Sequence, residues 1–296
     1  MIKHPASLRN LLKRLFCLLL SALLLQPVSV AAAESPAIGG RDSGIINILL
    51  IGQDRREESR ARSDCIILCT FHPESKTVTL TSFLRDLYVD IPGYEKNRIN
   101  AAYAYGGTAL LAETLQKNFD IYTDGCVEVD FSSFAQIIDV LGGVSMELRQ
   151  DEAEAINRAV PGSLTEGTHL LSGSQALAYS RIRNLDQDGD FSRTSRQRRL
   201  LTSLLSSYRN ADLLTILSAV VDMLPMISTD LNKKQVLMLA AKLFPLIDGP
   251  TVVSQRIPAD GTYSCKTICR MEVLVADMEK TRELLRKTLL PPAPAD

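Results

Sequence analysis

Four arginines and three aspartates crowd into one short stretch of the chain, Tyr179–Gln197. Arg181 and Arg183 stand two residues apart, so an extended backbone would turn both guanidinium groups to one side. Forked guanidinium donors match the oxygens of phosphate groups, which makes the stretch a candidate anion site. The alternative is a solvated loop in which aspartates and arginines pair with each other. The seven charged residues are Arg181, Arg183, Asp186, Asp188, Asp190, Arg193 and Arg196.

A helix is expected directly after this loop. From Arg193 to Leu205, arginines and then leucines recur at helical spacing, so one face begins with charged donors and becomes apolar. Ser192 is the expected N-cap, which places Arg193 and Arg196 in the first turns. Cations there oppose the helix dipole, and the arrangement is unfavourable unless an anion lies nearby.

A second group of charged residues stands at the ends of three expected strands, Ile45–Ile51, Cys65–Phe71 and Thr77–Phe83. In a meander, the end of the first strand, the start of the second and the end of the third meet at one edge of the sheet. Each charged residue alone is an ordinary strand-end residue, but several at one edge indicate a site. The residues that this edge would collect are Asp54, Arg62, Asp64 and Arg85.

Composition narrows the classes of function. The 296 residues are 46% hydrophobic and 5% aromatic, with no Trp, which argues against a platform that stacks sugars or bases. Of the 33 basic residues four lie in the leader, and the remaining 29 face 34 acidic residues. A body with a net negative charge is a poor partner for nucleic acid, so any anion must be recognised by a local cluster of arginines. The basic leader residues are Lys3, Arg9, Lys13 and Arg14.

Residues 1–33 have the pattern of a targeting segment. Basic residues precede the apolar run Leu15–Leu25, and Ala31–Ala33 follow as a small-residue cleavage site. An uncleaved membrane anchor is the alternative, since residues 15–33 are nearly long enough to span a bilayer. In both cases the body is expected outside the cytoplasm, secreted or anchored at the membrane. Residues 34–44 contain Pro and Gly and form an expected linker.

The cysteines and histidines give little support for a zinc site or a serine hydrolase, and they suggest one disulfide at most. Cys65 and Cys69 are four apart in one strand, too distant to bond. Cys265 and Cys269 are expected to form a disulfide if a turn bends them together. A zinc site is not expected, because no His lies near the cysteines in sequence. A serine hydrolase finds no G-x-S-x-G support, so His169 is interpreted as a structural or surface residue.

The two charged groups lie within motifs that resemble the LytR-CpsA-Psr family of cell-envelope enzymes. The motifs keep the family's order from Asn47 to Leu205, which makes the match specific. Leu84 is a departure, because the family commonly has Pro there, and the resemblance is weak beyond Leu205. The matching segments are Asn47–Asp54, Arg62–Asp64, Thr81–Asp86, Ile91–Gly93, Arg98–Gly107, Val129–Phe131, Asp139–Val144, Leu171–Arg183 and Gly189–Gln197.

The resemblance implies an α/β fold with three α-β-α layers around a central mixed sheet. It also implies an extracytoplasmic, Mg²⁺-dependent phosphotransferase at the membrane surface. Such enzymes move a glycopolymer, for example teichoic acid or capsule, from an undecaprenyl-pyrophosphate carrier to peptidoglycan. The catalytic domain would cover residues 45–210. Residues 211–290 would be an extension of helices and strands packed on the same domain, and residues 291–296 a tail.

By the same resemblance the charged residues divide into roles. Asp54 and Asp64 would hold Mg²⁺, which proteins bind with one or two carboxylates plus substrate phosphates. Arg62, Arg85 and Asp190 would be catalytic, Asp190 by steadying the arginines or assisting proton transfer. The pyrophosphate would be bound by Arg62, Arg85, Arg181, Arg183, Arg193 and Gln197.

Two other functions remain open for the same site. A polyprenyl-pyrophosphate phosphatase or pyrophosphatase would release the phosphate to water, and only the choice of acceptor distinguishes it. A non-enzymatic binder of polyprenyl lipids would keep the arginines but has no need of Asp54 and Asp64. All three functions require a dry apolar cavity for the lipid, whose lining the sequence does not identify.

Overall fold

The computed structural model describes residues 38, 44–53, 63–186, 188–246 and 249–290, all of which belong to one compact unit, Ala37–Asp296. The predicted leader, most of the predicted linker, Asp54, Arg62 and the tail lie outside the described residues. Within the described part, no helix is both long and apolar enough to cross a membrane.

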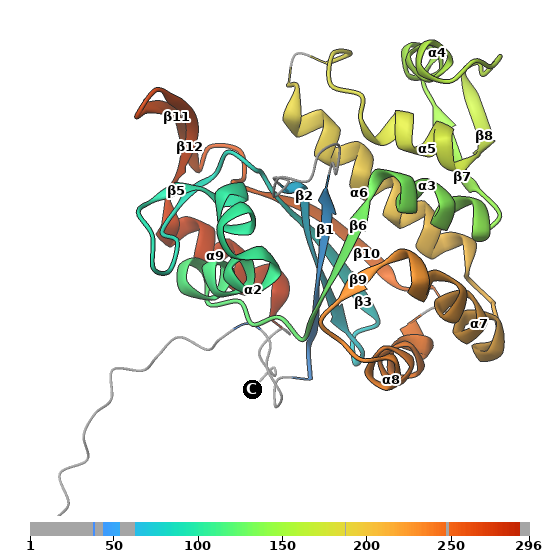
Figure 1. The fold of residues 1–296 in the computed structure, drawn as a ribbon, viewed down its shortest axis with the longest axis horizontal. Helices are drawn as coiled ribbons and strands as arrows, with labels where there is room; N and C mark the ends of the chain where they lie inside the picture. Colours follow the sequence, from blue (N-terminus) through green and yellow to red (C-terminus); the bar gives the residue numbers. More distant parts are fainter. Residues whose placement is uncertain (1–37, 39–43, 54–62, 187, 247–248, 291–296) are drawn as a thin grey trace, which may run out of the picture. The chain divides into compact units, whose positions relative to one another are not determined.

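A mixed sheet of six strands forms the centre of this unit (Figure 1). β1, β2 and β3 form the antiparallel meander expected from the sequence. β10 is parallel to β3, β6 is parallel to β1, and β9 is antiparallel to β6. In the order in which they pair, the strands are β10 (Thr251–Ile257), β3 (Thr77–Phe83), β2 (Ser63–His72), β1 (Ile46–Gln53), β6 (Gly125–Asp130) and β9 (Ser228–Thr229).

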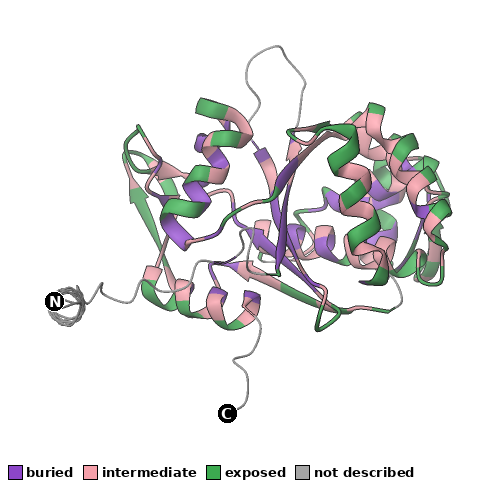
Figure 2. Ribbon diagram, turned by 90° about the horizontal axis from the view of Figure 1, so that it is seen from below, coloured by how far each residue is buried: buried purple, intermediate pink, exposed green. Residues whose placement is uncertain are grey.

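Helices cover both faces of the sheet, which confirms the predicted three layers. Side chains alternate along β1, so Leu49 enters the core on one face and Ile48 the core on the other. Helices α2 (Ile99–Phe119) and α9 (Met278–Leu289) contribute to the first core. The other face packs against three more helices, and Figure 2 shows the buried strands between the layers. These helices are α6 (Asp190–Ser207), α7 (Leu213–Met223) and α8 (Lys233–Leu243).

A third apolar core lies beside the sheet. There α6 packs against a small group of helices and a hairpin through residues such as Leu200, Tyr179 and Ile156. This group comprises α3 (Phe131–Val140), β7 (Val144–Leu148), α4 (Gln150–Ala159), β8 (Gly167–Leu171) and α5 (Gly173–Ser180). The remaining elements are short: β4 (Tyr88–Val89), β5 (Asn97–Arg98), the 3₁₀ turns Leu224–Met226 and Phe244–Leu246, and the hairpin of β11 (Tyr263–Ile268) and β12 (Met271–Ala276).

The predicted N-cap of the helix after the arginine loop needs correction, and one other helix is irregular. The irregular helix is α2, which begins at Ile99 and breaks at Gly106–Gly107. Gly107 has φ +67°, which favours glycine. α6 begins at Asp190, after Gly189, so Ser192 lies inside the helix and is not its N-cap. The carboxylate of Asp190 therefore provides the anion at the positive end of the helix dipole.

The expected disulfide is absent, since Cys265 and Cys269 are both free and exposed in the structure. Cys265 lies within β11, where it pairs in register with Leu274 of β12, whereas Cys269 lies in the connecting turn. An extended strand carries the chain away at about 3.3 Å per residue. The hairpin pairing thus keeps the segment extended, and the predicted bend between the two cysteines does not form.

Candidate active site

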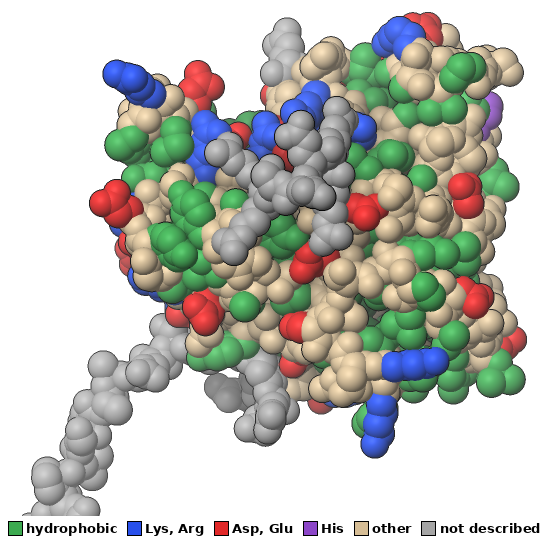
Figure 3. Space-filling view, viewed as in Figure 1, with side chains coloured by type: hydrophobic (Ala, Val, Ile, Leu, Met, Phe, Trp, Pro, Cys, Tyr) green, Lys and Arg blue, Asp and Glu red, His purple; other side chains and the backbone are tan. Residues whose placement is uncertain are grey.

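Asp64 and Arg85 meet at the edge of the sheet where β1, β3, β6 and β10 all end. Asp64 is at the beginning of β2 and Arg85 follows the end of β3. Arg85 Nη1 donates a 2.7 Å hydrogen bond to Asp64 Oδ1. The meander thus brings these two together as predicted, at the edge where open α/β sheets usually bind ligands. Figure 3 shows basic and acidic side chains gathered along the top of the unit.

Arg85 is surrounded by carboxylates. Its Nε lies 3.6 Å from Asp86 Oδ2 and 3.7 Å from Asp190 Oδ2. Burial alone would lower the pKa of Arg85, but the attraction of Asp190, Asp64 and Asp86 outweighs it and raises the pKa. Arg85 is therefore a permanent cation, and with 28% of its side chain exposed it is accessible to an anionic substrate.

Asp190 occupies the first position of α6, and its Oδ1 lies 2.7 Å from Arg193 Nη2. Burial raises the pKa of the Asp190 carboxyl, and the charges of Asp86 and Asp64 add to this effect. The attraction of Arg85 and Arg183 opposes the shift without cancelling it. A carboxylate with a raised pKa accepts a proton more readily than an ordinary one.

Arg193 and Arg183 approach Asp64 in different ways. Arg193 is 2% exposed, and its Nη2 donates to the backbone carbonyl of Asp64 at 3.0 Å, which links α6 to β2. Arg183 is 43% exposed, with its Nη2 3.8 Å from Asp64 Oδ1. Arg183 is therefore open to a ligand, whereas Arg193 is an enclosed part of the cluster.

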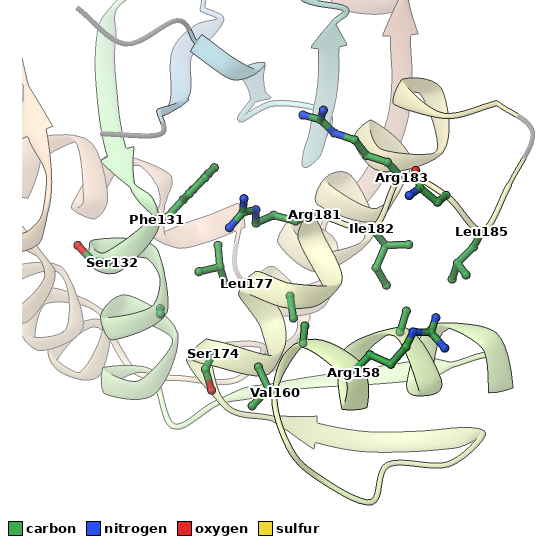
Figure 4. Close-up of a pocket in the computed structure, with 15 residues that line it drawn as sticks. Phe131, Ser132, Arg158, Val160, Ser174, Leu177, Arg181, Ile182, Arg183 and Leu185 are labelled. Atoms are coloured by element: carbon green, nitrogen blue, oxygen red, sulfur yellow. The ribbon is translucent and has the colours of Figure 1, made fainter. Parts of the chain in front are cut away.

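Arg181 ends α5 with φ −102° and ψ −5°, so the backbone there is helical and not extended as expected. Its guanidinium lies 4.6 Å from the centre of the Phe131 ring, a cation–π contact (Figure 4). Arg181, Arg183 and Arg158 line one open cavity of about 800 Å³ between α3, α4 and α5. We call this the arginine cavity; its three cations give it a positive lining.

Arg196 turns away from the site into the protein. Its guanidinium lies 2.9 Å from Glu152 Oε1 and 2.5 Å from Asp186 Oδ2, and Glu152 is 1% exposed. Burial would raise the pKa of Asp186, but its hydrogen bonds with Arg196 and Arg149 lower it. Pairing within the stretch thus occurs between Asp186 and Arg196 and between Asp190 and Arg193, whereas Arg183 lies nearest to Asp64, outside the stretch.

Gln197 lies one turn after Arg193 on α6 and lines a small cavity of about 140 Å³ with Gly52 and Ser180. Its buried Oε1 has no hydrogen-bond partner. Leu50 and Leu201 line this cavity and also a larger one of about 420 Å³ between the sheet and α6, α7 and α8. The walls of the larger cavity are almost wholly apolar, and include Ile48, Leu80, Leu205, Ile216, Leu239 and Leu243.

The two cavities adjoin at Leu50 and Leu201, and we call them together the apolar channel; Gly52 and Cys65, which pair beside Asp64 at the end of β1, line its smaller part. The sequence predicted the need for such a channel but not its lining, because α7 and α8 reach it through tertiary packing. Two further charged residues were also missed. Asp86 contacts Arg85, and Arg98 Nη1 lies 3.2 Å from Asp86 Oδ1. Both occur in the segments that resemble the family, which is the signal that would have identified them.

The residues that the structure describes include no group of three or more His, Cys, Asp or Glu placed to hold a metal ion. Of the predicted pair, Asp64 lies in the cluster, while Asp54 falls outside the described part. The oxygen donor set nevertheless fits Mg²⁺, which takes one or two protein carboxylates and completes its shell with water and phosphate oxygens.

The sequence model of the LytR_cpsA_psr family matches residues 27–287. The chain therefore belongs to this family, as its motifs suggested. Regulatory protein MsrR of Staphylococcus aureus (strain COL) is 37% identical over 166 residues, which are 55% of this chain and 49% of that protein. The chain thus aligns with about half the length of that curated relative.

A second relative is a polyisoprenyl-teichoic acid–peptidoglycan teichoic acid transferase, TagT of Bacillus subtilis (strain 168). It is 34% identical over 216 residues, 70% of this chain and 65% of that protein. A solved structure of TagT bound to LIIa-WTA superposes with TM-score 0.69 and 28% identity, covering 88% of this chain and 99% of the other. The structure of TagT with bound octaprenyl pyrophosphate lipid superposes with TM-score 0.64 and 26% identity, covering 87% of this chain and 98% of the other.

Proposed function

We propose that this protein transfers a glycopolymer from a polyprenyl-pyrophosphate carrier to peptidoglycan. One observation carries the proposal: Gly52, Cys65 and Gln197 line the smaller part of the apolar channel, and Cys65 directly follows Asp64, the partner of Arg85 at the charged edge of the sheet. A lipid chain needs a dry apolar cavity, whereas a pyrophosphate needs forked cationic donors, and this fold joins the two. The related TagT transferase and its octaprenyl pyrophosphate complex support the same function.

The proposed role of each arginine follows from the exposure of its side chain. Arg85 and Arg183 are accessible and would bind the phosphate oxygens, and Arg62 is proposed to join them. Arg193 is enclosed and would hold Asp64 and Asp190 in position. Preorganised cations of this kind stabilise the charge that spreads over phosphate oxygens during phosphoryl transfer.

Asp190 is proposed to accept the proton of the acceptor hydroxyl. The acceptor oxygen then bonds to the phosphorus next to the glycopolymer. The bond from that phosphorus to the bridging oxygen breaks, and polyprenyl phosphate leaves with the electron pair. Asp54 and Asp64 would hold Mg²⁺, which supplies additional positive charge at the pyrophosphate.

The remaining predicted ligands, Arg181 and Gln197, line two different cavities and would contact different parts of the donor. Arg181 faces the arginine cavity, which would receive the glycopolymer end of the donor. Gln197 faces the apolar channel, where its unpaired Oε1 lies among otherwise apolar walls. We propose an extracytoplasmic position at the membrane surface, since the carrier is a membrane lipid and the first 33 residues have the composition of an export segment or anchor.

The test is to incubate the full chain with a polyprenyl-pyrophosphate-linked sugar, Mg²⁺ and peptidoglycan fragments, and to analyse the products by mass spectrometry. The expected product is a peptidoglycan fragment carrying the phosphosugar. Release of the phosphosugar to water in the presence of the acceptor would instead establish a pyrophosphatase. Tight lipid binding without turnover would establish a lipid-binding protein.

A further inference from the structure

A second opening reaches Asp190 from the side opposite the arginine cavity. It is a cleft of about 330 Å³ between the first turn of α6 and the β11–β12 hairpin. Figure 1 shows this hairpin on one side of the upper edge of the sheet and α3, α4 and α5 on the other. The residues that line the cleft include Asp86, Asp190, Phe191, Cys265, Thr267 and Glu272.

The hairpin is fixed to the active site through its backbone. Leu274 N donates to Asp86 O at 2.9 Å, and Leu274 also forms a parallel bridge with Leu87. Arg98 connects the two segments, because it pairs with Asp86 and its Nη2 donates to the carbonyl of Glu272 at 2.5 Å. A ligand held by the hairpin is therefore held in a defined position relative to Arg85 and its neighbours.

The end of the hairpin nearest its turn lines the cleft, from Cys265 to Thr267 and from Glu272 to Leu274. In the antiparallel register, Cys265 is opposite Leu274 and Thr267 is opposite Glu272, so these four side chains share a face. Tyr263 belongs to the same face and contacts Phe191 of α6, with 5.7 Å between the ring centres. Lys266 and Val273, on the other face of the hairpin, also line the cleft, whereas Ser264 is not among its lining residues.

The charges of the cleft distinguish it from the arginine cavity. Asp86, Asp190 and Glu272 border it, against a single basic residue, Lys266. Asp86 and Asp190 are already paired with arginines that do not line the cleft, so a phosphate finds no arginine among the lining residues. A neutral hydroxyl-rich molecule finds carboxylate oxygens, the hydroxyl of Thr267 and the apolar surface of Phe191. The arginine cavity has the reverse character, with three arginines.

We propose that this cleft, which we call the hairpin cleft, binds the acceptor: a neutral saccharide whose attacking hydroxyl is directed at Asp190. The inference rests on the proposed transfer reaction, and it assigns the acceptor, the second substrate of that reaction, to the hairpin cleft. The donor and acceptor then approach the reacting phosphorus from opposite sides. That arrangement suits an in-line displacement, in which the entering and leaving oxygens lie across the phosphorus from each other.

The test uses the full chain and two variants of the cleft, Thr267→Ala and Glu272→Gln. Thr267→Ala removes a hydroxyl, and Glu272→Gln replaces a charged acceptor oxygen by an amide donor. We therefore expect the KM for a peptidoglycan tetrasaccharide to rise about threefold to tenfold per variant. The matched control is Ser264→Ala on the same strand, at a position that does not line the cleft, which should leave that KM unchanged. The affinity for octaprenyl pyrophosphate should be unaltered in all three variants.

Binding of the tetrasaccharide is measured directly by saturation-transfer NMR in the absence of donor. This measurement tests the acceptor site independently of whether the protein catalyses transfer. Signal in the unaltered protein and its loss in the Thr267→Ala, Glu272→Gln double variant would support the hairpin cleft even if no transfer occurred. An unchanged signal in the double variant, or an unchanged acceptor KM in a protein that turns over, would overturn it. Altered octaprenyl pyrophosphate affinity in the cleft variants would also overturn it, because the cleft would then serve the donor.

Discussion

Arg85 donates a 2.7 Å hydrogen bond to Asp64, although 21 positions separate the two residues along the chain. The meander of β1, β2 and β3 creates this contact at the edge of the sheet. Because both side chains remain partly exposed, the pair is open to a third group. Because a partly exposed ion pair contributes little to stability, a substitution of Asp64 can test its function without unfolding the protein.

Asp64→Asn is expected to abolish transfer while changing the melting temperature little. A partly exposed ion pair contributes only about 0–1 kcal/mol to stability, whereas loss of a carboxylate removes the proposed Mg²⁺ ligand. Turnover with and without EDTA, together with thermal melts, measures both effects. A large fall in melting temperature with EDTA-insensitive turnover in the unaltered protein would instead make Asp64 a structural residue.

Arg183→Ala is expected to weaken octaprenyl pyrophosphate binding by about 1.5–3 kcal/mol, the usual range for a hydrogen bond to a charged group. Arg183→Lys should restore the affinity only in part, because an ammonium group does not reproduce the forked donor geometry. Isothermal titration of both variants decides this. Affinity equal to that of the unaltered protein would place Arg183 outside the phosphate site.

Arg196→Ala should destabilise the fold by about 3–5 kcal/mol, because it leaves the carboxylate of Glu152 buried without its principal partner. The control is Arg199→Ala: Arg199 lies 3.5 Å from the same carboxylate but is 44% exposed, so its loss should cost less than about 1 kcal/mol. Urea denaturation gives both values. Equal destabilisation by the two variants would contradict the distinction.

The rate of transfer should fall at acidic pH because Asp190 becomes protonated. The midpoint of this fall, the acidic limb of the pH profile, should lie above the ordinary aspartate pKa of about 3.9. Its pKa is raised by burial, so the carboxylate becomes protonated, and unable to accept a proton, already at a higher pH than usual. Asp190→Asn should lower the rate and remove that limb. The same raised pKa means that ionisation of Asp190 opposes folding, so this variant should melt at an equal or higher temperature at neutral pH. An acidic limb that persists in Asp190→Asn would refute the role as proton acceptor.

Ala240→Trp should fill part of the apolar channel and reduce the affinity for octaprenyl pyrophosphate. Ala240 lines the larger cavity, about 420 Å³ in volume, on α8, far along the chain from the charged cluster. Inorganic pyrophosphate has no lipid chain, so its affinity should not change. Competition binding with both ligands measures the difference, and an equal loss for the two would indicate general damage to the fold.

Local patterns in the sequence determined the strand meander, the positions of most helices and the grouping of Asp64 with Arg85. These features depend on side-chain periodicity and on the geometry of neighbouring strands, which short segments carry. The same patterns identified Arg183 and Asp190 as residues of one loop and helix start. They did not distinguish the accessible Arg183 from Arg196, because burial beside Glu152 depends on how α4 packs against α6.

Tertiary structure alone decided the two features from which the proposed substrate sites are inferred. The apolar channel exists because α7 and α8 cover a face of the sheet built much earlier in the chain. The hairpin cleft exists because Leu274 pairs with the segment after β3. Contacts between residues so distant in sequence leave no periodic signal in either partner, so the proposed sites for the lipid, the phosphates and the acceptor could be inferred only from the folded chain.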